Sequence, residues 1–97
     1  MAAPSAPSAP ELAIGPVPHS LYVRNPVVAT AVKYTCYLSA TTGVGQAAFL
    51  VKKEAGVPDM EIHDLPDWPE VFVAQTATNA GDEESVDSAE DTIADWQ

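Results

Sequence analysis

The stretch TAVKYTCYLSATTGVGQAAFLVKKE, residues 30–54, decides the fold class. Its first eleven residues alternate between apolar and more polar side chains, and the positions on the apolar side are Val32, Tyr34, Cys36 and Leu38. This period of two is typical of a β-strand with one buried face. Gly43 and Gly45 supply a turn, after which residues 46–54 return as a second strand. The sequence therefore predicts an antiparallel hairpin.

Shorter strand-like stretches lie on both sides of this hairpin. Residues 21–28, LYVRNPVV, are rich in β-forming residues, but Pro26 interrupts them and favours an edge strand or a bend. Residues 60–65, MEIHDL, alternate again, and residues 71–76, VFVAQT, are an apolar strand that we expect to be covered on both faces. About five short strands predict a mainly β domain over residues 19–77, built as a small antiparallel barrel or sandwich.

The N-terminal segment has a different composition. Residues 2–10, AAPSAPSAP, repeat a Pro-Ser-Ala unit, and a proline at every third position favours an extended polyproline II conformation. We expect residues 1–18 to form an extended arm, which serves either as a spacer or as a contact.

The C-terminal segment, residues 78–97, is an acidic tail with a few apolar residues. Their spacing of three, four and three positions is that of one helix face: Val86, Ala89, Ile93 and Trp96. This pattern predicts a short amphipathic helix over residues 86–96. A helix of that length is not stable alone in water, so we expect it to order only when docked, on its own sheet or on another subunit.

Charge divides the chain unevenly. Residues 1–58 carry two acids and four bases, whereas residues 59–97 carry twelve acids and no base, which gives a net charge of −10. Four scattered cations do not form the basic stripe that nucleic acid requires, and an anionic membrane surface repels an acidic protein. We expect neither as a direct partner. The contrast between the halves favours head-to-tail contacts in a homo-oligomer or lattice.

Length and cysteine content limit the fold further. About sixty residues remain to form the core, a size at which a partner often stabilises the fold. Cys36 is the single cysteine and falls on the apolar side of its strand, so we expect a buried thiol. The opening residues lack the basic and apolar regions of a signal peptide. We expect a soluble protein that is not secreted, in the cytoplasm or on a virion.

One stretch offers ligands for a metal ion. Asp59, Glu61 and His63 alternate along a short strand and would point to one side, as oxygen and imidazole ligands of a divalent ion do. A solvated strand face opposite Met60 and Ile62 is the simpler interpretation. No GxSxG, GxGxxG or P-loop motif is present. We expect no catalytic residue and no cofactor.

These features favour a binding or assembly protein over an enzyme. We expect a non-enzymatic subunit that binds a larger multi-subunit structure through its arm, a sheet edge and its tail. The layout is similar to that of small virion proteins, such as the decoration, cement or minor capsid proteins of phage heads, without a shared motif. One alternative is an acidic inhibitor or chaperone that mimics nucleic-acid charge to occupy a basic protein surface. A second is a small metal-dependent enzyme.

The candidate partner-binding residues have four different roles. The whole set is Leu21, Tyr22, Val23, Lys52, Lys53, Trp68, Val86, Ile93 and Trp96. The first three are candidates for pairing at a sheet edge, and the two lysines are the most concentrated positive target for acidic groups. Trp68 lies between two prolines and is either an interface anchor or a cap on the core. The last three belong to the tail, where Ile93 and Trp96 are the expected anchors.

Overall fold

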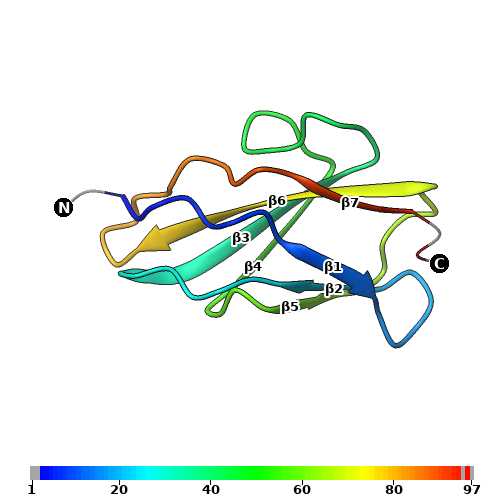
Figure 1. The fold of residues 1–97 in the computed structure, drawn as a ribbon, viewed down its shortest axis with the longest axis horizontal. Helices are drawn as coiled ribbons and strands as arrows, with labels where there is room; N and C mark the ends of the chain where they lie inside the picture. Colours follow the sequence, from blue (N-terminus) through cyan, green and yellow to red (C-terminus); the bar gives the residue numbers. More distant parts are fainter. Residues whose placement is uncertain (1–2, 95, 97) are drawn as a thin grey trace.

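The chain folds as a β-sandwich (Figure 1). The computed structural model describes residues 3–94 and 96, which form seven strands and no helix. The strands are β1 (Glu11–Ile14), β2 (Leu21–Arg24), β3 (Ala31–Ser39), β4 (Val51–Ala55), β5 (Met60–Ile62), β6 (Glu70–Asn79) and β7 (Asp91–Ala94). One sheet has the order β1-β2-β5 and the other β4-β3-β6-β7, with every pairing antiparallel. The predicted small antiparallel sandwich is confirmed.

The predicted hairpin is β3–β4, with Tyr34 opposite Ala55 at one end and Leu38 opposite Val51 at the other. Figure 1 shows the loop between these strands, in green, at the top of the molecule. The expected inward position of Val32 is wrong, because the β3–β6 register shifts between Ala31 and Lys33 and leaves Val32 56% exposed. An extra residue in one strand of a pair interrupts the in-out alternation at that point.

The core fills the space between the two sheets. Its buried members are Leu21, Val23, Tyr34, Cys36, Leu38, Met60, Ile62, Leu65, Val71, Val73, Ala77 and Trp96. A second, smaller cluster of Tyr37, Val44 and Ala74, with Phe72 against it, lies separately. Since Tyr37 and Ala74 belong to β3 and β6, these strands are covered on both faces, as we expected for residues 71–76.

The prediction of a helix over residues 86–96 is wrong. The tail instead forms β7, which pairs with β6 from Val73 opposite Asp91 to Glu70 opposite Ala94. The length of β6 explains the difference, because its unpaired N–H and C=O groups give an extended tail hydrogen bonds that a docked helix would not provide. Among the described residues, no helix is long and apolar enough to cross a membrane.

The arm lies against the body of the protein. In residues 3–10 every third side chain is buried, at Pro4, Pro7 and Pro10, while those between are exposed. This is the period of a polyproline II helix. The segment expected to be an arm also contains β1, which pairs with β2 from Glu11 opposite Arg24 to Ile14 opposite Leu21.

Candidate functional site

β2 is not an edge strand. It lies between β1 and β5, and Leu21 and Val23 are fully buried in the core. Tyr22, whose side chain points to the opposite face, is half-buried. The expectation that these three residues pair with another chain at a sheet edge is therefore wrong, because β1 occupies the side of β2 that the sequence left open.

The two lysines lie on a true edge strand, since β4 ends the four-stranded sheet. The Nζ atoms of Lys52 and Lys33 lie 3.8 Å and 3.5 Å from Oε2 of Glu54. These ion pairs are exposed and contribute little to stability. Three of the four basic residues of the chain thus lie on one hairpin, β3–β4.

Lys53 points to the other face of the sheet. It is opposite Cys36, whose side chain lies in the core, and directly opposite residues share a face. Lys53 therefore lies at the open margin of the sandwich, where it lines a hollow of about 330 Å³ beside Met60 and Glu61. An inward-pointing charge on an edge strand disfavours indiscriminate pairing with other strands.

Exposed apolar side chains flank these lysines. Leu50 and Val57, just before and just after β4, are 65% and 58% exposed. Val32 lies close to Gly56, the residue before Val57, since a Cβ atom built on Gly56 would be 3.9 Å from the Val32 carbonyl oxygen. We define the β4 edge surface as Val32, Lys33, Leu50, Lys52, Lys53 and Val57.

The expected tail anchors, Ile93 and Trp96, pack against the core of their own chain. Trp96 is 1% exposed, and its Nε1 donates a hydrogen bond to the carbonyl oxygen of Trp68 at 2.9 Å. The His19 ring meets the Trp96 ring edge to face, with centroids 6.2 Å apart. Trp68 and Ile93 pack against the core, so Trp68 caps the core in this structure. Val86 is 73% exposed and remains on the surface.

Glu90 of the tail binds the loop between β3 and β4. Its carboxylate accepts hydrogen bonds from the N–H groups of Gly43, at 2.8 Å, and Val44, at 3.3 Å, and from the Thr42 hydroxyl. The Thr42 hydrogen bond, together with those of the two backbone groups, lowers the pKa of Glu90 although partial burial opposes the shift. The ionised carboxylate is therefore the form that this contact favours.

Two further tail acids strengthen this attachment. Oε2 of Glu84 accepts hydrogen bonds from the Tyr37 and Thr76 hydroxyls, each at 2.5 Å. Asp87 accepts the N–H of Gln46 at 3.1 Å. Burial, and then the hydrogen bond to Glu84, raises the pKa of Tyr37 well above its ordinary value. Sequence reasoning missed these contacts, which join residues more than thirty positions apart or depend on the position of β6.

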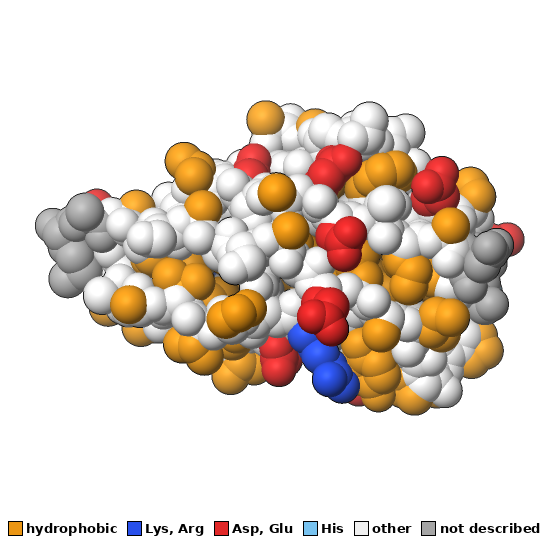
Figure 2. Space-filling view, in the orientation of Figure 1, with side chains coloured by type: hydrophobic (Ala, Val, Ile, Leu, Met, Phe, Trp, Pro, Cys, Tyr) orange, Lys and Arg blue, Asp and Glu red, His pale blue; other side chains and the backbone are white. Residues whose placement is uncertain are grey.

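Acidic side chains are dispersed among hydrophobic ones on the face that Figure 2 draws, without a single acidic patch. Three tail acids, Glu84, Asp87 and Glu90, are engaged by the loop and by β6. Because these three carboxylates already accept hydrogen bonds within the chain, fewer tail acids are available to bind a basic surface in the way that nucleic acid does.

The proposed metal ligands have other contacts. Oδ1 of Asp59 accepts the backbone N–H of Asn25 at 2.9 Å, and Nε2 of His63 lies 3.0 Å from Oε1 of Glu61. No group of three or more His, Cys, Asp or Glu side chains in the described part of the chain has an arrangement that could hold a metal ion. Cys36 is buried as expected, and burial raises the pKa of its thiol to about 12.

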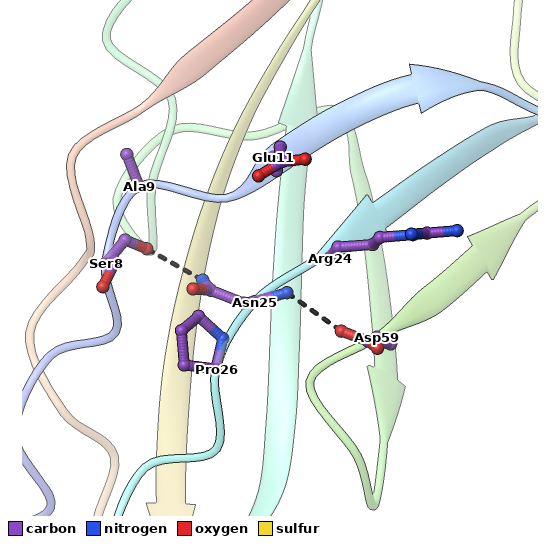
Figure 3. A pocket seen from close by; sticks show the side chains of 7 residues that line it. All are labelled: Ser8, Ala9, Glu11, Arg24, Asn25, Pro26 and Asp59. Atoms are coloured by element: carbon purple, nitrogen blue, oxygen red, sulfur yellow. Dashed lines mark hydrogen bonds between the residues drawn. The ribbon is translucent and has the colours of Figure 1, made fainter.

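A buried polar network joins the arm to both sheets, and Figure 3 shows its Ser8, Asn25 and Asp59 part. Nδ2 of Asn25 donates hydrogen bonds to the Ser8 carbonyl oxygen and to Oε1 of Gln75, both at 2.8 Å. Nε2 of Gln75 donates in turn to the Pro58 carbonyl oxygen at 2.8 Å. An open hollow of about 520 Å³ lies beside this network, and its lining is Ser8, Ala9, Glu11, Arg24, Asn25, Pro26 and Asp59.

Comparison with known proteins supports the fold alone. No protein-family model matches the chain, and neither does any curated protein. Among solved structures, the chain is similar to a Fn3-like protein from Clostridium thermocellum, with a TM-score of 0.73 and 13% sequence identity. The match covers 92% of this chain and 90% of that chain. At this identity the likeness shows a shared sandwich fold, and fold alone does not determine function.

Proposed function

We propose that the chain is a non-enzymatic assembly subunit that binds an acidic protein surface through its β4 edge surface. The observation that supports this proposal is the position of the cations. Lys33, Lys52 and Lys53 lie on one hairpin and outnumber its single acid, Glu54, in a molecule whose net charge is −10. Complementary charge accelerates encounter and fixes orientation, while apolar groups beside it supply affinity.

The contact is made by side chains rather than by adding a strand. Lysines on an edge strand disfavour pairing with an arbitrary second strand, whereas an acidic surface is attracted to them. Leu50 and Val57, at the two ends of β4, give the apolar component. The acidic second half of another copy of this chain has the required charge, so identical copies can associate head to tail and form a ring or lattice.

A virion shell is a more specific form of this proposal. Its support is the layout of an arm, a small β domain and an acidic tail, which resembles that of decoration proteins. The structure changes the roles of two of these parts, because the arm and the tail make contacts within their own chain.

The test is the mass of the full chain in solution, measured by light scattering over a range of concentrations at low and high salt. We expect association at low salt, and we expect Lys52→Glu with Lys53→Glu to abolish it. The single variant Lys52→Glu should weaken association, and Arg24→Glu is its matched control, because it reverses one charge at the one Lys or Arg outside the hairpin. A wild-type chain that stays monomeric throughout, or an equal loss in the two single variants, contradicts the proposal. A chain shortened after Asn79 would not test the tail separately, because it lacks β7 and Trp96, which are parts of the fold.

A further inference from the structure

The arm packs against the body of the protein through regularly spaced prolines. The buried side chains of residues 3–10 are Pro4, Pro7 and Pro10, and the serines and alanines between them face solvent. A polyproline II helix has three residues per turn, so these prolines form a single ridge along one side of the arm. The surface that these prolines cover therefore accommodates a proline at every third position of an extended segment.

One polar contact fixes the register of the arm. A polyproline II segment has no internal hydrogen bonds, so its carbonyl groups are available to a partner. Asn25 donates from Nδ2 to the carbonyl oxygen of Ser8, the residue directly after the middle proline. Figure 3 shows the Asn25 side chain directed toward Ser8 while its backbone N–H binds Asp59.

The Asn25 amide is held in one orientation. Nδ2 also donates to Oε1 of Gln75, and a flipped amide would place its oxygen against two acceptors. Asn25 follows β2 of one sheet and Gln75 lies in β6 of the other, so the arm meets this contact at the seam between the sheets. Grooves that bind proline-rich segments commonly combine shaped apolar contacts with a few donors aimed at carbonyl groups.

The connection between the arm and the body is strained. The turn from β1 to β2, residues 15–20, contains Pro16 and Pro18 and has His19 at a φ of 61°, in the left-handed region that residues other than glycine rarely adopt. In addition, Oδ1 of Asn25 is buried without a hydrogen-bond partner in the described part of the chain. Opening the turn releases the strain at His19, and prolines favour an extended connection.

We propose that this seam is a polyproline II binding site, and that residues 3–14 of a second copy occupy it by exchange of arms. Exchange keeps every contact of the arm and β1 but makes them between two chains, so it needs no new surface. The inference does not depend on the β4 edge surface. It assigns a binding site to the seam, with an extended Pro-x-x-Pro-x-x-Pro segment as its ligand.

The test detects one copy's arm on the body of another. Full-length Ser5→Cys chain, with natural isotopes, carries a nitroxide at its exposed arm position, while the buried Cys36 thiol stays unlabelled because its pKa is raised. This chain is unfolded and refolded together with an equal amount of ¹⁵N-labelled wild type. We expect the Asn25 side-chain amide and the Gln75 backbone amide of the ¹⁵N copy to lose up to about half of their NMR intensity, because random pairing gives half of the ¹⁵N copies a labelled partner. The intensity should return when the nitroxide is reduced.

Two controls separate the possible outcomes. Pro7→Asp in the labelled copy should abolish the intensity loss, provided that this variant keeps the Trp96 indole signal of the folded state. A nitroxide at Glu54→Cys instead reports contacts of β4. If the Glu54 label lowers NMR intensity in the ¹⁵N copy and the Ser5 label does not, arm exchange is overturned and the proposed function stands. If only the Ser5 label lowers the intensity, arm exchange stands and contact through β4 is overturned. Unchanged loss with Pro7→Asp overturns the recognition of the prolines.

Discussion

The indole N–H of Trp96 donates to the carbonyl oxygen of Trp68 at 2.9 Å, which ties the end of the tail to the corner before β6. This contact closes one end of the core, where Trp96 is almost fully buried. The acidic tail is therefore a structural element of the sandwich and not a solvated appendage.

Removing this side chain should destabilise the whole domain. We expect Trp96→Ala to lower the free energy of unfolding by about 3–5 kcal/mol, because it leaves a large cavity in the core. Trp96→Phe keeps much of the apolar surface and should lose less. Urea unfolding followed by circular dichroism measures both. Val86→Ala is the control, because Val86 is exposed and its change should stay within about 0.5 kcal/mol of wild type.

The hydrogen bonds of Glu90 predict a pH dependence of stability. The pKa of Glu90 is lowered from its ordinary value of 4.5 in the folded state, so its contribution is present above that value and is lost as pH falls through the folded pKa. Wild type and Glu90→Gln should therefore differ in urea midpoint near neutral pH and converge in acid. The effect should be small, since Glu90 is close to the surface.

Thr42→Val gives the control for this pH dependence, because the Thr42 hydroxyl is the largest cause of the lowered pKa. We expect Thr42→Val alone to reduce the difference in urea midpoint between neutral and acidic pH. Added to Glu90→Gln, it should have no further pH-dependent effect. An additive effect in the double variant would show that the two residues act independently.

Tyr37 should ionise later than an exposed tyrosine. Burial and the Glu84 carboxylate raise the pKa of Tyr37 above its ordinary value of 10.0. The folded state thus binds the phenolic proton more tightly, and the resulting stability is lost as pH rises above the unfolded pKa. An alkaline titration followed by tyrosine absorbance should show a late-titrating group that belongs to Tyr37. That late group should be missing in Tyr37→Phe, whereas a titration identical to wild type contradicts the assignment.

The hairpin was predictable because its information is local. The alternation of Tyr34, Cys36 and Leu38 and the turn glycines after them specify two paired strands without reference to the rest of the chain. β1 and β7 were missed for the opposite reason. Each has four residues in a segment rich in proline or acid, and each becomes a strand only because β2 or β6 offers it an edge.

The candidate site shows the same division. Lys52 and Lys53 lie in the second strand of the predicted hairpin, because the turn and the strand residues around them are visible in the sequence. The spacing of Val86, Ala89, Ile93 and Trp96 suggested a helix face, yet the described part of the tail is extended and pairs with β6. There, Ser85 and Ser88 bond to Ala77 and Gln75 through both backbone and side chain. Those hydrogen bonds depend on where β6 lies, which no local sequence pattern predicts.

The network of Asn25 and Gln75 should behave as a coupled pair. Gln75→Ala removes the acceptor of Asn25 Nδ2 and the donor to the Pro58 carbonyl oxygen, leaving buried polar groups unsatisfied at a cost of about 1–3 kcal/mol each. Once Asn25 is also alanine, part of that penalty has already been incurred. The double variant should therefore be less destabilised than the sum of the single variants, by about 1 kcal/mol or more, in urea unfolding. Gln75→Ala combined with Val17→Ala, at an exposed position away from this network, should be additive. Additivity of Gln75 and Asn25 would mean that their hydrogen bond does not couple the two sheets.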